Sequence, residues 1–499
     1  MARIGWGAVA AATAVALAST LAAAPPGVAA PAQGQAQGQA QEQGQAQEQG
    51  RGTLDGVWRM DGYGMVVVIA GDRLTTYDVT THSCVPGWIT ATRAGAPGPD
   101  GATRFTIGNN ALTLTPRGRD RLIDHEEGGV GAKTLNRLPA LPPLCTVPAP
   151  NDPLSVFDRF WEDFEENYPF FAAKGIDWHT VRDEQRAKIT PATTSEKLQE
   201  ILIDTIRPLG DAHTGLARYV DGEPKGVFGG RRPGTTRRTK ELVDRAGQAV
   251  AAQLTGPEQT FGDGRLGVGR LPDGVRYLRV SAFDGYTDGD YAGRAAQLDL
   301  ALDAVLADPE EITGLVIDVR LNGGGSDALG LQIASRLTDC PYLAYRKVAR
   351  NDPADPAKFT RPVPVAVQPS AGEHFTGPVT VLTSSISASA AETFTQALMG
   401  RSPHVTRIGE NTQGVYSDIL IKNLSPDFAV VLPNEKYLTR DGSTFDGPGI
   451  APDVPTPVYS AEELAALKDS ALSTARGVLA SETEEARGAR NARDAHDAR

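Results

Sequence analysis

Two apolar segments of this chain end abruptly in runs of small residues, and this feature limits the possible folds more than any other. The segment 314–319 (GLVIDV) is followed by three consecutive glycines at 323–325, and the segment 379–382 (VTVL) leads into a serine-rich turn and a helix-like stretch. Buried strands that end in such turns are typical of α/β proteins, where free main-chain N–H groups and a helix N-terminus face a developing anion. The pattern therefore predicts an α/β fold with an acyl-transfer site at its strand ends.

Strand and helix patterns alternate through the last part of the chain. Strands are predicted over 275–281, 314–319 and 379–383, and helices over 292–307, 328–337 and 390–399. This alternation indicates a mainly parallel sheet that is covered on both faces. We therefore expect a multidomain α/β protein whose catalytic core spans residues 275–460.

The first 30 residues have the pattern of a secretory signal peptide. A basic start (MAR) precedes an Ala-rich apolar stretch, and Val28-Ala29-Ala30 supplies the small residues that signal peptidase requires. The apolar run is also just long enough for an uncleaved membrane anchor, but Pro25 and Pro26 favour processing. Residues 31–52 are rich in Gln and Gly with almost no apolar side chains, so we expect a disordered linker there.

Residues 53–150 are predicted to form a β-rich domain, either a barrel or a sandwich. Short apolar runs in this region are separated by turns rich in Gly, Pro and Asn. Three aromatic residues of the region, Trp58, Tyr63 and Trp88, fit either a hydrophobic core or the wall of a ligand site. Of these two roles, the pattern favours packing in the core.

The three cysteines fit an exported protein. A disulfide between Cys84 and Cys145 would close a loop of about 60 residues and contribute about 4 kcal/mol of stability. Cys340 is left without a partner. No CxxC pair and no HExxH helix is present, so no motif points to a metal, and we expect neither a metal nor a cofactor.

Residues 151–225 are predicted to be helical, with a loop at 209–215 (LGDAHTG) that contains His213. An aromatic stripe at helical spacing predicts helix-on-helix packing, and it comprises Phe157, Phe160, Trp161, Phe164 and Tyr168. The Gly- and Arg-rich residues 226–274 are predicted to be a surface excursion or linker. Residues 461–499 are predicted to be helical at first and then disordered, because the end of the chain is highly charged. The formal net charge of −12 argues against a nucleic-acid partner.

Four segments resemble, in the same order, those of the tricorn-type and C-terminal-processing serine peptidases (the tail-specific protease family). They are Asp-x-Arg-x-Asn-x-Gly-Gly at 318–325, Ser-Ala-Ser-Ala-Ala-Glu at 387–392, Gly-Glu-x-Thr at 409–412 and Asp-Gly-x-Gly-Ile-x-Pro-Asp at 446–453. The resemblance covers the α/β core and, more loosely, the helical segment with His213. It implies a crotonase-like (ClpP/crotonase) catalytic core and peptidase activity.

The resemblance also implies roles for individual residues. The family nucleophile is the serine three residues before the glutamate, which is Ser389 here. One branch of the family uses a lysine after the Gly-Glu-x-Thr segment, but Val415 stands in that place. The chain is therefore nearer the Ser–His branch, in which the loop histidine, His213, is the general base. A neutral imidazole suits this role because its pKa lies near working pH.

Three further groups complete the predicted site. Asp446 takes the place of the family's late glutamate and is expected to orient the imidazole, with Asp211 or Thr214 as alternatives because Ala212 replaces a relay serine. The N–H groups of Gly324 and Ala390 are expected to form the oxyanion hole.

We therefore expect a secreted serine peptidase that acts on peptides or unfolded proteins and has no stable membrane insertion after signal cleavage. Two other functions remain open at this point. One is a non-catalytic ligand-binding protein on the same fold, and the other is an esterase- or amidase-type acyl hydrolase. The sequence leaves the oligomeric state and the substrate side-chain preference open.

Overall fold

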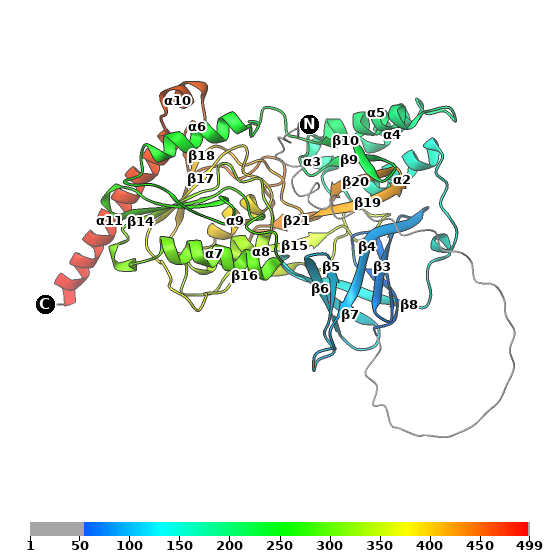
Figure 1. Ribbon diagram of the computed structural model, residues 1–499, viewed down its shortest axis with the longest axis horizontal. Coiled ribbons are helices and arrows are strands. Elements are labelled where there is room, and N and C mark those ends of the chain that lie inside the picture. Colours follow the sequence, from blue (N-terminus) through cyan, green and yellow to red (C-terminus); the bar gives the residue numbers. More distant parts are fainter. Residues whose placement is uncertain (1–53, 498–499) are drawn as a thin grey trace, which may run out of the picture.

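The computed structural model describes residues 54–497, so the predicted signal peptide and linker lie outside the described residues. In Figure 1, a blue-to-cyan barrel and a group of green helices lie at one end, and the α/β core with a long C-terminal helix lies at the other. Within the described residues, no helix is long and apolar enough to span a membrane.

The N-terminal domain is a closed barrel of eight antiparallel strands, which resolves the choice between barrel and sandwich. The first and last strands pair with each other, for example Trp58 with Arg137, and this pairing removes any free sheet edge. A disulfide joins Cys84 to Cys145, the pairing that the sequence predicts, while Cys340 is free and exposed. The strands are β1 (Gly56–Met60), β2 (Met65–Ala70), β3 (Arg73–Val79), β4 (Cys84–Ala94), β5 (Thr103–Ile107), β6 (Asn110–Pro116), β7 (Arg121–Glu126) and β8 (Lys133–Leu138).

The helical segment follows the barrel and buries the predicted aromatic stripe. Asp152 caps the first helix by accepting a hydrogen bond from the Ser155 N–H. Phe160 and Phe164 are fully buried, with ring centroids 5.2 Å apart, so the stripe is a packing core. The elements are η1 (Pro143–Thr146), α2 (Pro153–Asn167), α3 (Phe171–Lys174), α4 (Trp178–Arg186), α5 (Ser195–Ile206) and η2 (Arg207–Leu209).

A four-stranded sheet joins this segment to a late part of the chain. Its order is β10-β9-β20-β19, so strands about 200 residues apart in the sequence lie side by side. The strands are β9 (Gly215–Val220), β10 (Glu223–Gly229), β19 (Ile419–Ser425) and β20 (Phe428–Pro433). Because β9 and β19 both pair antiparallel with β20, their first residues lie at the same end of the sheet.

The main sheet has seven strands and confirms the predicted α/β core. It is parallel from β13 through β22, with the antiparallel β11 and β12 added at one edge. The strands are β11 (Gln259–Phe261), β12 (Leu266–Arg270), β13 (Val275–Val280), β14 (Gly314–Asp318), β17 (Val379–Thr383), β18 (Val405–Gly409) and β22 (Val454–Pro455).

The segment 226–274 differs from the predicted excursion, because it supplies both β11 and β12 to this sheet as well as helix α6. The glycines of LGVGR suggest a loop, yet they serve packing here. A Cβ at Gly269 would lie 2.8 Å from the Leu254 side chain, and one at Gly267 would collide with Glu258. Glycine at these positions therefore allows neighbouring side chains to pack directly on the strand.

Helices cover both faces of the main sheet. Leu302 of α7, Ile333 of α8 and Phe394 of α9 pack with alternate strand residues on one face, and Leu472 of α11 packs on the other. The helices are α6 (Lys240–Ala251), α7 (Tyr291–Val305), α8 (Asp327–Ser335), α9 (Ala390–Leu398), α10 (Ala461–Ala466) and α11 (Ser470–Asp497), with short turns η3 (Pro272–Gly274) and η4 (Pro309–Glu311). Helix α11 continues through the charged end that the sequence predicts to be disordered (Figure 1).

A three-stranded sheet of order β16-β15-β21 lies between the core and the barrel. Its strands are β15 (Tyr342–Ala349), β16 (Val363–Val367) and β21 (Glu435–Leu438). Buried polar contacts fix the barrel against the rest of the molecule. Lys422 of β19 is fully buried and donates to the carbonyl oxygens of Tyr63 and Gly64, at 2.6 Å each, and its Nζ lies 3.5 Å from Asp78.

Candidate active site

Ser389 lies at the sharp turn between strand β17 and helix α9. Its φ of 58° and ψ of −123° are uncommon for a residue with a side chain and cost of order 1–3 kcal/mol. The turn is held by the Ser389 N–H, which donates to the Val415 carbonyl at 2.9 Å and to Glu392 Oε2 at 3.2 Å. Such a turn is a known way to present a nucleophilic hydroxyl at a helix N-terminus.

The other serines of the turn have structural roles. Ser384 Oγ donates to the Arg320 carbonyl at 2.6 Å, and Ser387 Oγ donates to the Val319 carbonyl at 2.8 Å. Ser385 Oγ accepts the Thr236 N–H at 3.1 Å. Of the four, Ser389 is the one that lines a cavity of about 310 Å³, which we call the catalytic cavity.

The glycine run passes directly beside the nucleophile. A Cβ on Gly324, whose φ is 113°, would lie 2.6 Å from the Ser389 Cβ, so only glycine fits there. The Gly324 N–H donates to Asn322 Oδ1 at 2.8 Å, so this predicted oxyanion donor is already engaged. In the described part of the chain, no acceptor is found for the N–H groups of Gly325 and Ala390. Gly325 lines the catalytic cavity, whereas Gly324 does not.

A buried ionic cluster holds the start of the glycine loop. Arg320 is 1% exposed and binds two carboxylates, with Nη2 2.6 Å from Asp318 Oδ2 and Nη1 2.7 Å from Asp469 Oδ1. Burial alone would raise the pKa of Asp318, but the charge and hydrogen bonds of Arg320 lower it overall. The start of the glycine loop, directly after β14, is therefore held in place by the ion pairs of Arg320 with Asp318 and Asp469.

His213 reaches the catalytic cavity from the loop before β9. Asp211 shapes this loop, because its Oδ1 accepts the His213 N–H at 2.9 Å and its Oδ2 accepts the Tyr168 hydroxyl at 2.8 Å. Thr214 Oγ1 donates to the Asp211 carbonyl at 2.8 Å. Asp211 and Thr214 therefore bind the main chain of the loop, and the structure gives neither of them a hydrogen bond to the imidazole.

Small apolar residues bring the two halves of the site together. Ala212, Ala388 and Val415 form a buried cluster, so the residue before His213 packs against the residue before Ser389. Val415, which stands where the Ser–Lys branch has its lysine, fills this contact. His213 and Ser389 then line the same cavity.

The surroundings of His213 favour the neutral imidazole. Burial lowers its pKa below the ordinary value, and the charges of Asp211 and Asp418 and the main chain of Ser417 only partly oppose this. The ring Nδ1 is buried and has no hydrogen-bond partner. A neutral ring at pH 7 can accept a proton, which a general base requires.

Asp418, rather than Asp446, shares the catalytic cavity with His213. Asp418 precedes β19 and His213 precedes β9, and both strands begin at the same end of the four-stranded sheet. Burial alone would raise the pKa of Asp418, but Lys347, whose Nζ lies 2.6 Å from Oδ2, and other cations lower it overall. Asp418 is thus an ionised carboxylate whose charge acts on the imidazole. An aspartate just before a strand carries no sequence signal for this role.

Asp446 has other partners. Its Oδ1 accepts the Tyr416 N–H at 3.1 Å and its Oδ2 accepts the Thr444 hydroxyl at 2.7 Å. Burial and the nearby Asp211 raise its pKa to about 7. It therefore supports the loop around Tyr416, and the structure does not bring it to the cavity with Ser389 and His213.

Glu392 links the nucleophile helix to the neighbouring loop. Its carboxylate accepts the Gly414 N–H at 2.6 Å and the Val415 N–H at 2.8 Å, besides that of Ser389. Burial raises its pKa to about 8. It therefore fixes the position of Val415 relative to Ser389.

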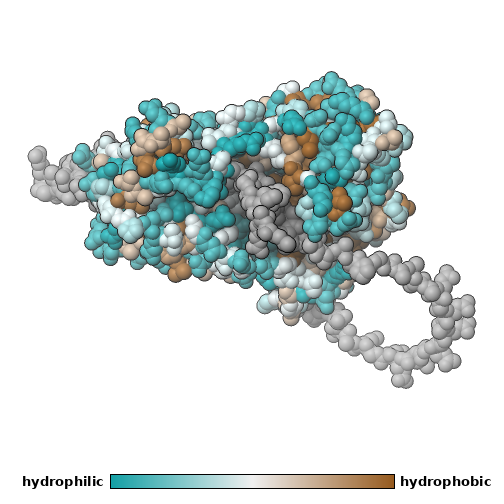
Figure 2. All heavy atoms as spheres, turned by 45° about the horizontal axis from the view of Figure 1, so that its top comes forward, coloured by the Kyte–Doolittle hydropathy of each residue, from teal (hydrophilic) through white to brown (hydrophobic). Residues whose placement is uncertain are grey.

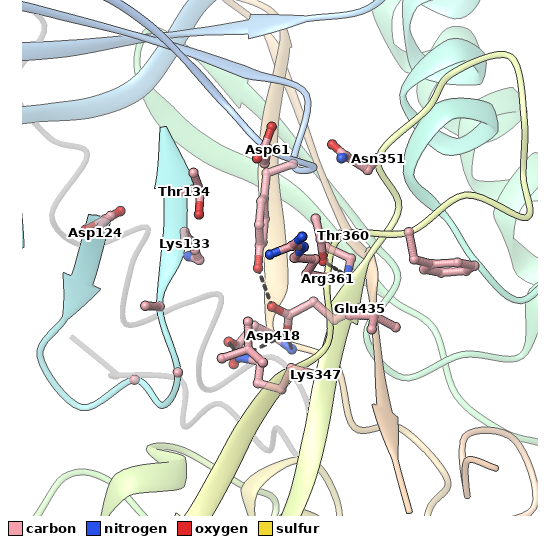
Figure 3. A pocket seen from close by; sticks show the side chains of 18 of the residues that line it. Asp61, Asp124, Lys133, Thr134, Lys347, Asn351, Thr360, Arg361, Asp418 and Glu435 are labelled. Carbon is pink, nitrogen blue, oxygen red and sulfur yellow. Dashed lines mark hydrogen bonds and ion pairs between the residues drawn. The ribbon is translucent and has the colours of Figure 1, made fainter. Parts of the chain in front are cut away.

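A second pocket of about 600 Å³, the charged pocket, adjoins the catalytic cavity at the junction of the barrel and the three-stranded sheet. Figure 3 shows Lys347, Asp418 and Glu435 close together, with Asp124 and Lys133 on the barrel strands beside them. Lys347 Nζ lies 2.6 Å from Asp418 Oδ2 and 3.2 Å from Glu435 Oε2. Asp418 lines both hollows, so this pocket continues directly into the site.

Comparisons with known proteins identify peptidase domains in this chain. Residues 274–456 match the model of peptidase family S41, and residues 149–206 match that of the Tricorn protease C1 domain. A peptidase candidate from Parabacteroides merdae has a similar structure, with a TM-score of 0.54 and 25% identity over 66% of this chain and 97% of that one. Mature CPAF gives a TM-score of 0.47 at 14% identity (64% and 95% covered), and the tricorn protease 0.41 at 12% (85% and 46% covered). No curated protein matches the chain significantly.

Proposed function

We propose that this chain, a serine-type peptidase with a family S41 domain at residues 274–456, is exported and cleaves peptide bonds with Ser389 as nucleophile and His213 as general base. One observation carries the proposal. Ser389, His213 and the Gly325 main chain line one cavity, with the N–H group of Ala390 next to the nucleophile. This combination of nucleophile, base and anion donors is what acyl transfer requires.

The reaction follows from the roles of these groups. Ser389 Oγ attacks the carbonyl carbon of the scissile bond while the His213 ring accepts the hydroxyl proton. The N–H groups of Gly325 and Ala390 stabilise the oxyanion of the tetrahedral intermediate. When the C–N bond breaks, His213 gives the proton to the leaving amine, and water then hydrolyses the acyl-enzyme with the same base.

Flexible peptides and unfolded segments are the proposed substrates. Ser389 is half-buried in the wall of a cavity that barrel and core residues line together, and a flexible chain enters such a cavity more easily than the surface of a folded protein does. Export is proposed from the signal-like residues 1–30, and the disulfide between Cys84 and Cys145 supports it, because disulfides persist in oxidising compartments. Exported protein should begin near Pro31, as N-terminal sequencing can establish.

Labelling with a fluorophosphonate probe tests the nucleophile and the base. Wild-type protein should be labelled, and Ser389→Ala and His213→Ala should both abolish labelling, because the hydroxyl reacts only when a base takes its proton. Ser385→Ala is the matched serine control, since its hydroxyl accepts a main-chain N–H, and the exposed His404 gives the matched control His404→Ala. Both controls should be labelled like wild type, and wild type should hydrolyse casein.

Three results would contradict the proposal. Absence of labelling in folded wild-type protein would favour a binding protein on the same fold. Labelling that survives His213→Ala would mean that another group is the base. Hydrolysis of simple esters without any cleavage of casein or peptides would favour the esterase alternative.

Asp418 is the group that we propose to stabilise the protonated His213. Asp418→Asn is expected to lower kcat by about 10- to 100-fold, less than the roughly 10⁴-fold seen where a carboxylate bonds directly to the catalytic imidazole. Because the Asp418 charge raises the pKa of His213, its removal should also move the acid limb of the kcat/KM profile to lower pH. Asp446→Asn should leave the acid limb of the profile unchanged. If Asp446→Asn shifts the acid limb and Asp418→Asn does not, Asp446 is the residue that orients the imidazole.

A further inference from the structure

The catalytic cavity extends from Ser389 and His213 into the interior of the N-terminal barrel. Besides the catalytic groups, it is lined by inward-facing barrel residues, among them Met65, Leu74, Trp88, Ile89, Ile107 and Leu112. The barrel is therefore part of the wall around the nucleophile, and it does not stand apart as a separate domain.

The cavity takes up only part of the barrel interior. Trp58 and Phe105 are at most 1% exposed and lie outside its lining, so they fill the rest of the barrel interior. Trp88 is half-buried and is one of the lining residues. Trp58 and Tyr63 thus belong to the core that the sequence favours for them, and Tyr63 and Trp88 line the cavity.

Strand β19 connects the barrel cavity to the chemistry. It begins directly after Asp418, and Ile419, Leu420 and Ile421 continue the apolar lining away from His213. The buried Lys422 then binds the barrel main chain, and the Asn423 N–H donates to Asp78 Oδ2 at 2.9 Å. These contacts fix the position of the barrel relative to strand β19.

A mainly polar and a mainly apolar binding surface meet where the catalytic cavity adjoins the charged pocket. The catalytic cavity and the charged pocket share Tyr63, Asp124, Glu126, Lys133 and Asp418. A substrate main chain, which needs hydrogen-bond partners, suits the charged pocket, whereas the barrel interior offers mainly apolar contacts. On the face shown in Figure 2, hydrophobic side chains occur only in small scattered groups, so this apolar lining has no counterpart on that surface.

We infer that the barrel interior is the specificity pocket of the enzyme and takes one large apolar side chain that flanks the scissile bond. The inference rests on the proposed function and names its substrate class: unfolded segments with residues such as Phe, Leu or Met at the cleavage site. A volume of about 310 Å³ is at the lower end of ligand pockets and suits one large side chain. The charged lining residues Asp124, Glu126 and Lys133 are shared with the charged pocket, so a charged side chain would find partners on that side of the cavity and would lose its hydration against the apolar barrel residues.

Internally quenched peptides that differ only at the two positions flanking the scissile bond test this inference. Peptides with Phe or Leu should have kcat/KM values about 10- to 100-fold above the Ala peptide, and Asp or Lys should be poorer still. Ile107 is half-buried and lines the cavity, so Ile107→Trp should fill part of it. The ratio of kcat/KM for the Phe peptide to that for the Ala peptide should then fall at least tenfold. Ile123→Trp is the matched control, because Ile123 is a half-buried residue of the same barrel that does not line the cavity.

Fluorophosphonate labelling separates failure of this inference from failure of the proposed function. Labelled wild-type enzyme that cleaves Phe and Ala peptides equally, or that responds alike to Ile107→Trp and Ile123→Trp, would overturn the inference and leave the peptidase intact. Absence of any labelling would instead remove the proposed function on which the inference depends.

Binding can be measured without turnover, in case Ile107→Trp does not fold. In the Ser389→Ala protein, the Phe peptide should change the tryptophan fluorescence saturably, and Trp88→Phe should remove that change. Saturable binding of lauric acid without any response to the Phe peptide would overturn the inference in favour of a lipid pocket.

Discussion

Replacing Ser389 or His213 by alanine is expected to lower kcat for peptide hydrolysis by about 10⁶-fold each, and the double variant should be no slower than either single one. The two side chains act as a unit, because the hydroxyl attacks only as the imidazole takes its proton. Once one is missing, the other has nothing left to contribute. The residual rate then comes from the N–H groups of Gly325 and Ala390 and from substrate binding.

The measurement is single-turnover hydrolysis of a quenched peptide by protein whose active-site content has been titrated with the fluorophosphonate probe. Ser385→Ala and His404→Ala serve as controls for the substitution itself. If the fold-loss of kcat in the double variant equals the product of the two single fold-losses, Ser389 and His213 act independently, and the proposed roles are contradicted.

The second large effect concerns stability. Arg320→Met is expected to lower the free energy of unfolding by about 3–5 kcal/mol, because it leaves Asp318 and Asp469 buried without their counter-charge. The lowered pKa of Asp318 contributes stability that is present above its unfolded value and is lost as the pH falls through the folded value. In the variant, the buried carboxylates can take up protons instead. The difference in the free energy of unfolding between Arg320→Met and wild type should therefore become smaller as the pH falls from 7 towards 4.

Urea unfolding followed by near-ultraviolet circular dichroism measures this difference. Arg186→Met is the matched control, since Arg186 forms an exposed pair with Asp158 (2.7 Å) and should cost at most about 1 kcal/mol. Equal losses in the two variants would mean that the buried cluster is not an anchor of the glycine loop.

Local patterns in the sequence predict much of this molecule. The alternation of strands and helices predicts the α/β core, because each such element is a short-range feature. Ser389 and His213, by contrast, are chosen because their segments resemble those of a peptidase family. The short punctuated strands predict the β-rich N-terminal domain but leave the choice between a barrel and a sandwich open.

Features that depend on contacts between distant segments escape the sequence. Asp418 and His213 line the same cavity because β20 pairs with both β9 and β19. No local sequence pattern predicts that sheet. Gly324 and Gly325 look alike in sequence, yet the Asn322 side chain engages the N–H of only the first. The strand β12 is hidden by glycines that serve packing.

The four-stranded sheet has a consequence for modularity. The family match begins at residue 274, but β9, which pairs with β20, lies before that boundary together with His213. A fragment cut at the boundary would carry Ser389 without His213, the base that we propose, and β20 would present an unpaired edge of the kind that promotes aggregation. The segment recognised by similarity is thus smaller than the unit that folds and works, and activity cannot be transplanted with that segment alone.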